Sequence, residues 1–238
     1  ADAARKKLET VYLEFSPEPP EHSVRYLVRA GNPVEEILRA REEVSADLLI
    51  LGTTGVGRVK ELLLGSTAHQ VIRSSPVPIL LVPESAPKPL DAPRSILAPV
   101  DFSKASAHGL HKANEVRARF DAAMTICHIA VIPTMPGDPF IGTLATPLEE
   151  QTARLRGSLQ TFVTKELPDH AGDIDVVVEW GESTQGINAV VEAHDSDLII
   201  MGTHGRRGLA RWFLGSTTER YLRHAERPVL VFSPHQTT

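Results

Sequence analysis

Two stretches of the chain combine glycines with hydroxyl side chains at the same spacing, and they are the best candidates for chemistry. The first is Gly52-Thr-Thr-Gly55, followed after nine residues by Gly65-Ser66-Thr67. The second is Gly202-Thr-His-Gly205, followed after nine residues by Gly215-Ser216-Thr217. The offset between them is 150 residues (202 − 52), and residues related by this offset are called counterparts below.

Each motif sits between an apolar run, at 48–51 or 198–201, and a segment with the pattern of a helix. A strand, a glycine loop and a helix start present backbone N–H groups that bind phosphate. Basic residues between the glycines would add positive charge, although solvated surface charge explains them equally well: Arg206, Arg207 and Arg211, and Arg58 and Lys60. A structural alternative is a capping box, with Ser216 as the helix cap and Glu219 as its partner.

Asp101 lies at the end of a third apolar run, in Pro99-Val-Asp101-Phe-Ser103. A carboxylate at the end of such a strand can accept hydrogen bonds from a ribose or a base, and it can equally be a turn residue. His128 and His204 lie in separate segments without the spacing of metal ligands. We therefore predict no catalytic residue and no metal bound by side chains.

The composition narrows the classes of protein to consider. The 238 residues carry a net charge of −5 and only 5% aromatic residues, which argues against a nucleic-acid binder. No apolar run approaches the roughly 20 residues of a membrane span. The single cysteine, Cys127, lies in an apolar run and is predicted to be a buried side chain. A cytoplasmic protein is the expectation.

The elements that must position these residues alternate between strand and helix. In the C-terminal half, strands are predicted at 95–100, 124–131, 174–178, 198–201 and 229–232, with a helix between each pair. This alternation favours a parallel sheet with helices on both faces, and ligands bind where the chain reverses direction beside the first strand. The N-terminal half is predicted to hold helices at 2–16, 33–44 and 66–73 and strands at 24–28, 48–51 and 79–82.

The offset of 150 residues extends well beyond the glycine motifs. Gly31, Asp47 and Pro78 have the identical counterparts Gly181, Asp197 and Pro228. Residues 94–150 have no counterpart, so the N-terminal half is predicted to lack its first two strands. Such a half would have a gap in the middle of its sheet, with unpaired backbone groups. We expect a longer native chain, with a second copy filling the gap as the alternative.

These motifs together resemble the universal stress protein family in its tandem, two-repeat, ATP-binding form. The resemblance implies an α/β fold with two doubly wound five-stranded parallel sheets of strand order 3-2-1-4-5, like those of related adenine-nucleotide hydrolases. It divides the chain into a partial first repeat (1–83), a proline-rich linker (84–93) and a complete second repeat (94–238). It also implies that the repeats pair through their last strands, 79–82 against 229–232, with a homodimer as a further option.

The resemblance assigns binding roles to particular residues. Pro99, Asp101 and Ile129 would meet adenosine, and Met201 and Gly202 the ribose. The phosphates of ATP, with Mg²⁺, would lie against Gly205, Arg206, Gly215, Ser216 and Thr217. The equivalent candidate binding residues of the first repeat are Gly52, Gly55, Gly65, Ser66 and Thr67. Their assignment is less well supported, because this repeat offers no residues to contact the adenine.

The predicted function is a nucleotide-dependent regulator of the stress response. One alternative is an interaction module whose glycine loops are structural. Another is an ATP-cleaving enzyme, which would require a glycine-rich phosphate-binding motif after the strand at 95–100. Because Pro99-Val-Asp101-Phe-Ser103 does not supply one, at most slow hydrolysis is expected.

Overall fold

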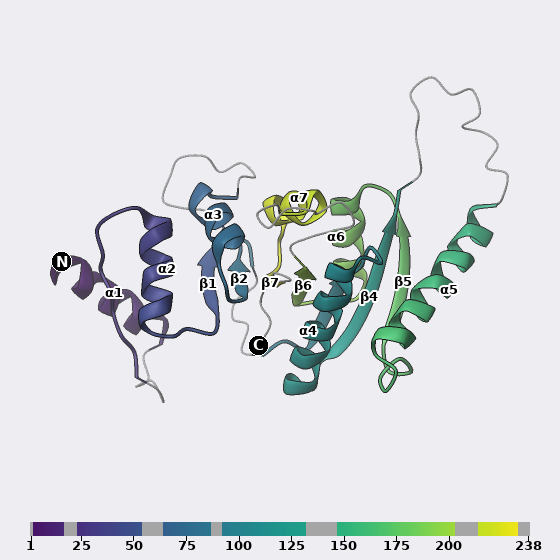
Figure 1. The fold of residues 1–238 in the computed structure, drawn as a ribbon, viewed down its shortest axis with the longest axis horizontal. Coiled ribbons are helices and arrows are strands. Elements are labelled where there is room, and N and C mark those ends of the chain that lie inside the picture. The colour runs from purple at the N-terminus through teal and green to yellow at the C-terminus, as the bar shows by residue number, and fades with distance from the viewer. Residues whose placement is uncertain are drawn as a thin grey trace, which may run out of the picture. The chain divides into compact units, whose positions relative to one another are not determined.

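The computed structural model describes residues 2–16, 23–53, 64–86, 92–131, 147–202 and 214–232 (Figure 1). Contacts divide the chain into two compact units, residues 1–46 and residues 47–238. We describe each unit by itself. Among the described residues, no helix combines the length and the apolar character that a membrane crossing requires.

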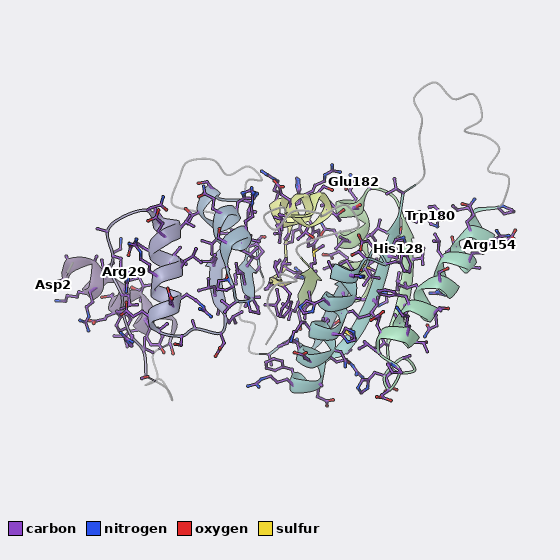
Figure 2. The ribbon with its side chains drawn as sticks, in the orientation of Figure 1. Asp2, Arg29, His128, Arg154, Trp180 and Glu182 are labelled. Carbon is purple, nitrogen blue, oxygen red and sulfur yellow. The ribbon has the colours of Figure 1, made fainter. Side chains whose placement is uncertain are left out.

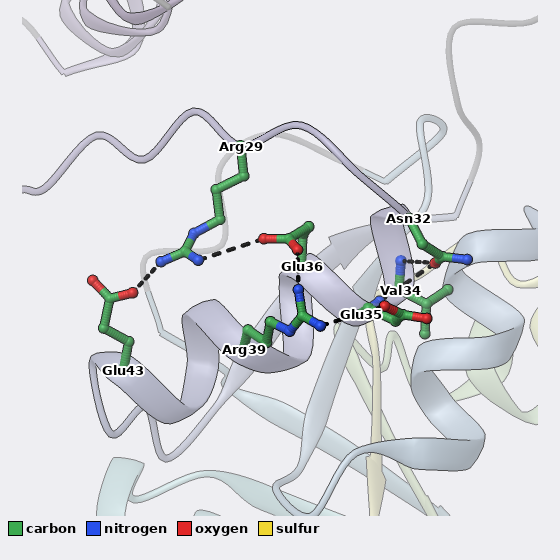
Figure 3. A network of polar contacts seen from close by, with 7 residues as sticks. All are labelled: Arg29, Asn32, Val34, Glu35, Glu36, Arg39 and Glu43. Carbon is green, nitrogen blue, oxygen red and sulfur yellow. Dashed lines mark hydrogen bonds and ion pairs between the residues drawn. The ribbon is translucent and has the colours of Figure 1, made fainter.

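The first unit contains helices α1 (Asp2–Phe15) and α2 (Pro33–Glu43). Asn32 caps α2 as its sequence position predicts, because its side chain accepts from the N–H groups of Val34 and Glu35. The strand predicted at 24–28 is wrong, since residues 23–30 form neither helix nor strand. Arg29 of this segment instead forms ion pairs with Glu36 and Glu43 of α2 (Figure 3).

The second unit contains all the strands among the described residues. The strands are β1 (Leu49–Gly52), β2 (Ile79–Val82), β3 (Ser95–Pro99), β4 (Ala123–Ala130), β5 (Asp175–Trp180), β6 (Leu198–Gly202) and β7 (Val229–Phe232). The helices are α3 (Ser66–Ser74), α4 (Lys104–Phe120), α5 (Leu148–Glu166), α6 (Ser183–Ala193) and α7 (Ser216–His224). The strands form one sheet in the order β1-β2-β7-β6-β3-β4-β5 (Figure 1).

The described strands thus form one seven-stranded sheet, whereas the resemblance implied two five-stranded sheets, the first of them incomplete in this chain. All neighbouring strands run parallel except β2 and β7, which are antiparallel. The predicted pairing of 79–82 with 229–232 is confirmed, with Leu80 directly opposite Leu230. Through this pair, β1 and β2 of the N-terminal half extend the sheet of the C-terminal half.

The core lies on both faces of the C-terminal part of the sheet. On one face, Ile96, Ile126 and Ile200 pack with Leu110 of α4 and Leu159 of α5. The alternate strand residues are also buried, because successive side chains of a strand point to opposite faces. Those residues include Leu97, Cys127 and Ile199. Helices α6 and α7 contact each other, and α6 packs on β4 and β5.

Candidate functional site

The candidate site lies where β3, the central strand of the C-terminal half, ends between β4 and β6. The β3–β4 ladder continues to Pro99 opposite Cys127. The β3–β6 ladder ends earlier, at Leu97 opposite Ile199. Pro99 and Gly202 therefore lie beyond the paired part of the β3–β6 ladder, although each pairs with the strand on its other side. In open α/β sheets this is the position at which ligands bind.

Asp101 lies two residues after the end of β3 and is fixed in a turn. Its Oδ1 accepts a hydrogen bond from the N–H of Ser103 at 3.0 Å. The Oγ of Ser103 in turn accepts from the N–H of Ser106 at 3.1 Å and so caps α4. Asp101 is thus a turn residue, which is one of the two roles that its sequence position suggested. The turn holds its carboxylate near the end of β3.

Two aromatic residues that sequence reasoning did not assign to the site support this turn. Phe102 has φ +63°, a conformation that costs a non-glycine residue on the order of 1 kcal/mol. Its ring packs at 4.7 Å from the ring of His128 and at 5.5 Å from that of Phe162. His128 lies on β4 (Figure 2). Its Nδ1–H donates to the carbonyl of Val100 at 2.8 Å. The only indication in the sequence that an aromatic residue supports the site was the position of Phe102 next to Asp101.

His128 therefore has a structural role. In the described part of the chain, no group of three His, Cys, Asp or Glu side chains is arranged to hold a metal ion. Ile129, the next residue of β4, packs against α6. A Cβ added at Gly186 of α6 would lie only 2.8 Å from Cγ2 of Ile129.

Gly202 ends β6 beneath the first turns of α4. A Cβ added there would lie 2.7 Å from the carbonyl oxygen of Ala105, which is closer than real Cβ contacts. Gly109 of α4 makes the reciprocal approach, since a Cβ added to it would lie 3.0 Å from the backbone nitrogen of Gly202. Close helix–strand packing is therefore sufficient to explain why position 202 is a glycine.

The start of α7 differs from the predicted capping box. Gly215 is the N-cap, Ser216 is the first helical residue, and no side-chain cap hydrogen bond is present. Glu219 does not turn back to the cap. Its Oε1 lies 2.7 Å from Nη2 of Arg223 and 3.6 Å from Nε2 of His69. The first N–H groups of α7 thus have no side-chain acceptor among the described residues.

A hydrogen bond holds this helix start beside the end of β6. The Oγ1 of Thr218 donates to the carbonyl of Gly202 at 3.0 Å. Gly202 is thereby held beside the first turn of α7, in which Ser216 and Thr217 are not buried. The predicted residues Gly205 and Arg206 lie outside the described residues.

The N-terminal half contains the same helix start in a smaller setting. Gly65 is the N-cap of α3, again without a side-chain cap, and its φ and ψ of −55° and 141° match the −59° and 139° of Gly215. The N–H of Gly65 donates to the carbonyl of Thr53 at 2.8 Å, which connects Ser66 and Thr67 to the end of β1 at Gly52. Gly55 lies outside the described residues.

Glu182 ties α6 to α7 near the candidate site. Its Oε2 accepts from the N–H groups of Thr184 and Gln185 at 2.8 and 3.1 Å, and its Oε1 accepts from Arg220 at 3.0 Å. Partial burial acts to raise the pKa of this carboxyl, but these hydrogen bonds outweigh it and the net pKa is lowered. Glu182, labelled in Figure 2, is therefore the N-cap residue of α6.

Together the fold and the site define an α/β protein that carries two strand–glycine loop–helix units on one mostly parallel sheet. The sequence profile of the Universal stress protein family matches residues 1–83 and 93–233. The chain therefore belongs to the universal stress protein family.

Individual relatives agree with this assignment. The chain is 28% identical over 211 residues to a universal stress protein of Mycobacterium tuberculosis, covering 87% of this chain and 72% of that protein. The crystal structure of a universal stress protein from Archaeoglobus fulgidus is similar with a TM-score of 0.63 and 26% identity, covering 98% of this chain and 78% of that one. A Pseudomonas aeruginosa structure described as a universal stress protein shares the fold, with a TM-score of 0.65, 20% identity, and coverage of 97% and 78%.

Proposed function

We propose that this universal stress protein binds ATP in its C-terminal half and acts as a nucleotide-dependent regulator of the stress response. The observation that carries the proposal is the start of α7. Gly215 begins the helix without a side-chain cap, and the Thr218–Gly202 hydrogen bond fixes this start at the end of β6. Uncapped N–H groups at a helix N-terminus attract anions through hydrogen bonding and the helix dipole.

The residues around this point fit a nucleotide with its phosphates toward α7. The N–H groups of Gly215, Ser216 and Thr217 would hold the phosphates, with Mg²⁺ as their counterion. Gly205 and Arg206 are proposed to belong to the same phosphate set. The carboxylate of Asp101 is held at the end of β3 by Ser103, where it would accept from the ribose. The backbone near Pro99 and Ile129, and the buried Met201, would line the adenosine.

The same proposal includes the repeat organisation. Residues 1–83 and 94–238 would be two repeats of one doubly wound design, joined by a linker at 84–93. In support, the C-terminal half has the strand order β5-β4-β3-β6-β7, which is 3-2-1-4-5 when counted within that half. Because Pro99 and Asp101 lie in the C-terminal half, we place the nucleotide there.

No residue is proposed to catalyse hydrolysis, since neither the sequence nor the described site supplies a general base next to the phosphate position. We also propose a cytoplasmic location, with homodimerisation as a further option. The competing function is an interaction module without a nucleotide. The contact between Gly202 and Ala105 favours that alternative, because packing alone can account for this glycine.

Titration calorimetry with Mg·ATP tests the proposal on the full chain. We expect saturable binding of one ATP per chain. Gly215→Val should weaken binding at least about tenfold, because a branched side chain would fill the space in front of the helix start. The matched control is Gly65→Val at the counterpart position, which should leave binding unchanged. Absence of saturable binding to the unmodified, folded protein would favour the interaction module.

A further inference from the structure

The two halves meet around a local two-fold axis that the register of β2 and β7 defines. Leu80 lies directly opposite Leu230, and these residues are counterparts (230 − 80 = 150). On either side, Ile79 faces Val231 and Leu81 faces Val229. A residue can face its own counterpart only where a two-fold axis relates the two copies. The axis therefore passes through the Leu80–Leu230 pair.

A second pair of counterparts meets between the helices. His69 of α3 and Glu219 of α7 are also 150 positions apart, and Nε2 of His69 lies 3.6 Å from Oε1 of Glu219. Their side chains are 25% and 34% exposed, so the pair is partly shielded from water. The same axis thus passes close to both the strand pair and the helix pair.

The two pairs on the axis differ in chemistry. At the strands the counterparts are both leucine. This contact would therefore be the same whether two different halves or two copies of one half came together. At the helices one counterpart is a base and the other an acid. Pairing of two C-terminal halves would place Glu219 against Glu219, and pairing of two N-terminal halves would place His69 against His69. Like charges at such a contact are unfavourable, whereas His69 and Glu219 attract when the imidazole is protonated.

We propose that the His69–Glu219 pair determines which partner this surface accepts. The surface formed by β2 and α3 takes the surface formed by β7 and α7, and neither takes a second copy of itself. Two counterparts of opposite charge type at a symmetry axis select between partners in two ways. They attract the other half, and each repels a second copy of its own half.

Other charged groups near the pair follow the same asymmetry. Glu219 also accepts from Arg223 of α7 at 2.7 Å, which keeps the carboxylate in place. The counterpart of Arg223 is Arg73, one turn after His69 on α3. In the double variant His69→Glu/Glu219→His, Arg73 would therefore lie four residues after the acid, as Arg223 does in the unmodified protein. Exchanging the two residues should preserve the interaction.

Amide hydrogen exchange of the full chain, followed by mass spectrometry at about pH 6, tests the proposal. His69→Glu creates within one chain the Glu–Glu contact that two C-terminal halves would make. We expect the segments 79–82 and 229–232 to exchange about threefold faster in this variant. The double variant His69→Glu/Glu219→His should return the rate to within about twofold of the unmodified protein.

Two controls separate this from a general loss of structure. Gln70→Glu adds the same charge one residue away from the axis and should leave the rates unchanged. Exchange in β4 should stay constant in all variants, because β4 lies away from the β2–β7 contact. The proposal is overturned if the double variant exchanges as fast as His69→Glu, or if Gln70→Glu has the same effect as His69→Glu.

Discussion

The two halves of the chain carry the same motif in surroundings that differ greatly in burial. Ile200 of β6 is 1% exposed, whereas its counterpart Ile50 of β1 is 63% exposed. Strand β6 has a neighbour on each side, β7 and β3, and α4 packs on it. Among the described residues, β1 pairs with β2 alone. The comparison shows that an apolar strand sequence becomes a core strand only where neighbours exist to cover it.

The same comparison applies to the candidate sites. The C-terminal half brings together the Asp101 turn, the end of β6 and the start of α7, through contacts at Gly202. Among the described residues, the N-terminal half brings together the end of β1 and the start of α3. The helix starts at Gly65 and Gly215 thus have the same geometry, but only the one at Gly215 has the other candidate site residues around it. We expect the following variants to show how far this difference extends.

The largest effect is expected for the isoleucine counterparts. Ile200→Ala removes a fully buried side chain and should lower the free energy of unfolding by about 3 kcal/mol. Ile50→Ala removes a mostly exposed side chain and should cost less than about 0.5 kcal/mol. Urea denaturation followed by circular dichroism measures both values. Equal costs would mean that β1 is covered to the same degree as β6 in solution.

A smaller difference is expected at the glycines that end β6 and β1. Gly202→Ala places a Cβ 2.7 Å from the carbonyl oxygen of Ala105, so α4 must shift, at a cost of about 2 kcal/mol. Gly52 is exposed and its half has no counterpart of α4, so Gly52→Ala should cost less than about 0.5 kcal/mol. The same denaturation experiment compares them. A harmless Gly202→Ala would contradict the close packing of α4.

The smallest effect concerns the helix caps Glu182 and Asn32, which are counterparts (182 − 32 = 150). Since the pKa of Glu182 is lowered on folding, its carboxylate adds stability above the unfolded-state pKa. This contribution is lost as the pH falls through the lower, folded-state pKa. Glu182→Gln should therefore cost about 0.5 kcal/mol at pH 7, allowing for solvent screening, and nothing at about pH 2.

Asn32→Ala provides the uncharged comparison. The amide oxygen of Asn32 accepts the hydrogen bonds of the α2 cap and has no carboxyl group to titrate. Its cost, about 1 kcal/mol for a lost cap, should change little with pH. Thermal unfolding at several pH values compares the two caps. A Glu182→Gln cost that persisted at about pH 2 would contradict the role given to the charge.

Much of the local structure followed from the sequence because it depends on neighbouring residues. Caps at Asn32, Ser103 and Glu182 satisfy N–H groups only two or three residues away, so their positions could be predicted. The family resemblance likewise implied which strands would pair across the two halves, and this pairing is observed. The helix start at α7 was predicted, but its capping box was not observed, because Glu219 bonds Arg223 and approaches His69 of α3 instead.

The predicted strand at 24–28 shows what local pattern leaves open. Its β-forming residues have β5 as their counterpart in the C-terminal half, and β5 exists by pairing with β4. Among the described residues, no strand pairs with 24–28, and backbone groups without a partner strand do not form a ladder.

The sequence by itself determined the repeated glycine motif, the helix and strand pattern of the C-terminal half, and the buried position of Cys127. Only the tertiary structure decided that the strands of both halves form one seven-stranded sheet, that Phe102 and His128 hold the Asp101 turn, and that α4 closes over Gly202. The reason is physical. Turns and caps depend on residues close in the chain, whereas sheet edges, burial and helix contacts depend on residues that only folding brings together.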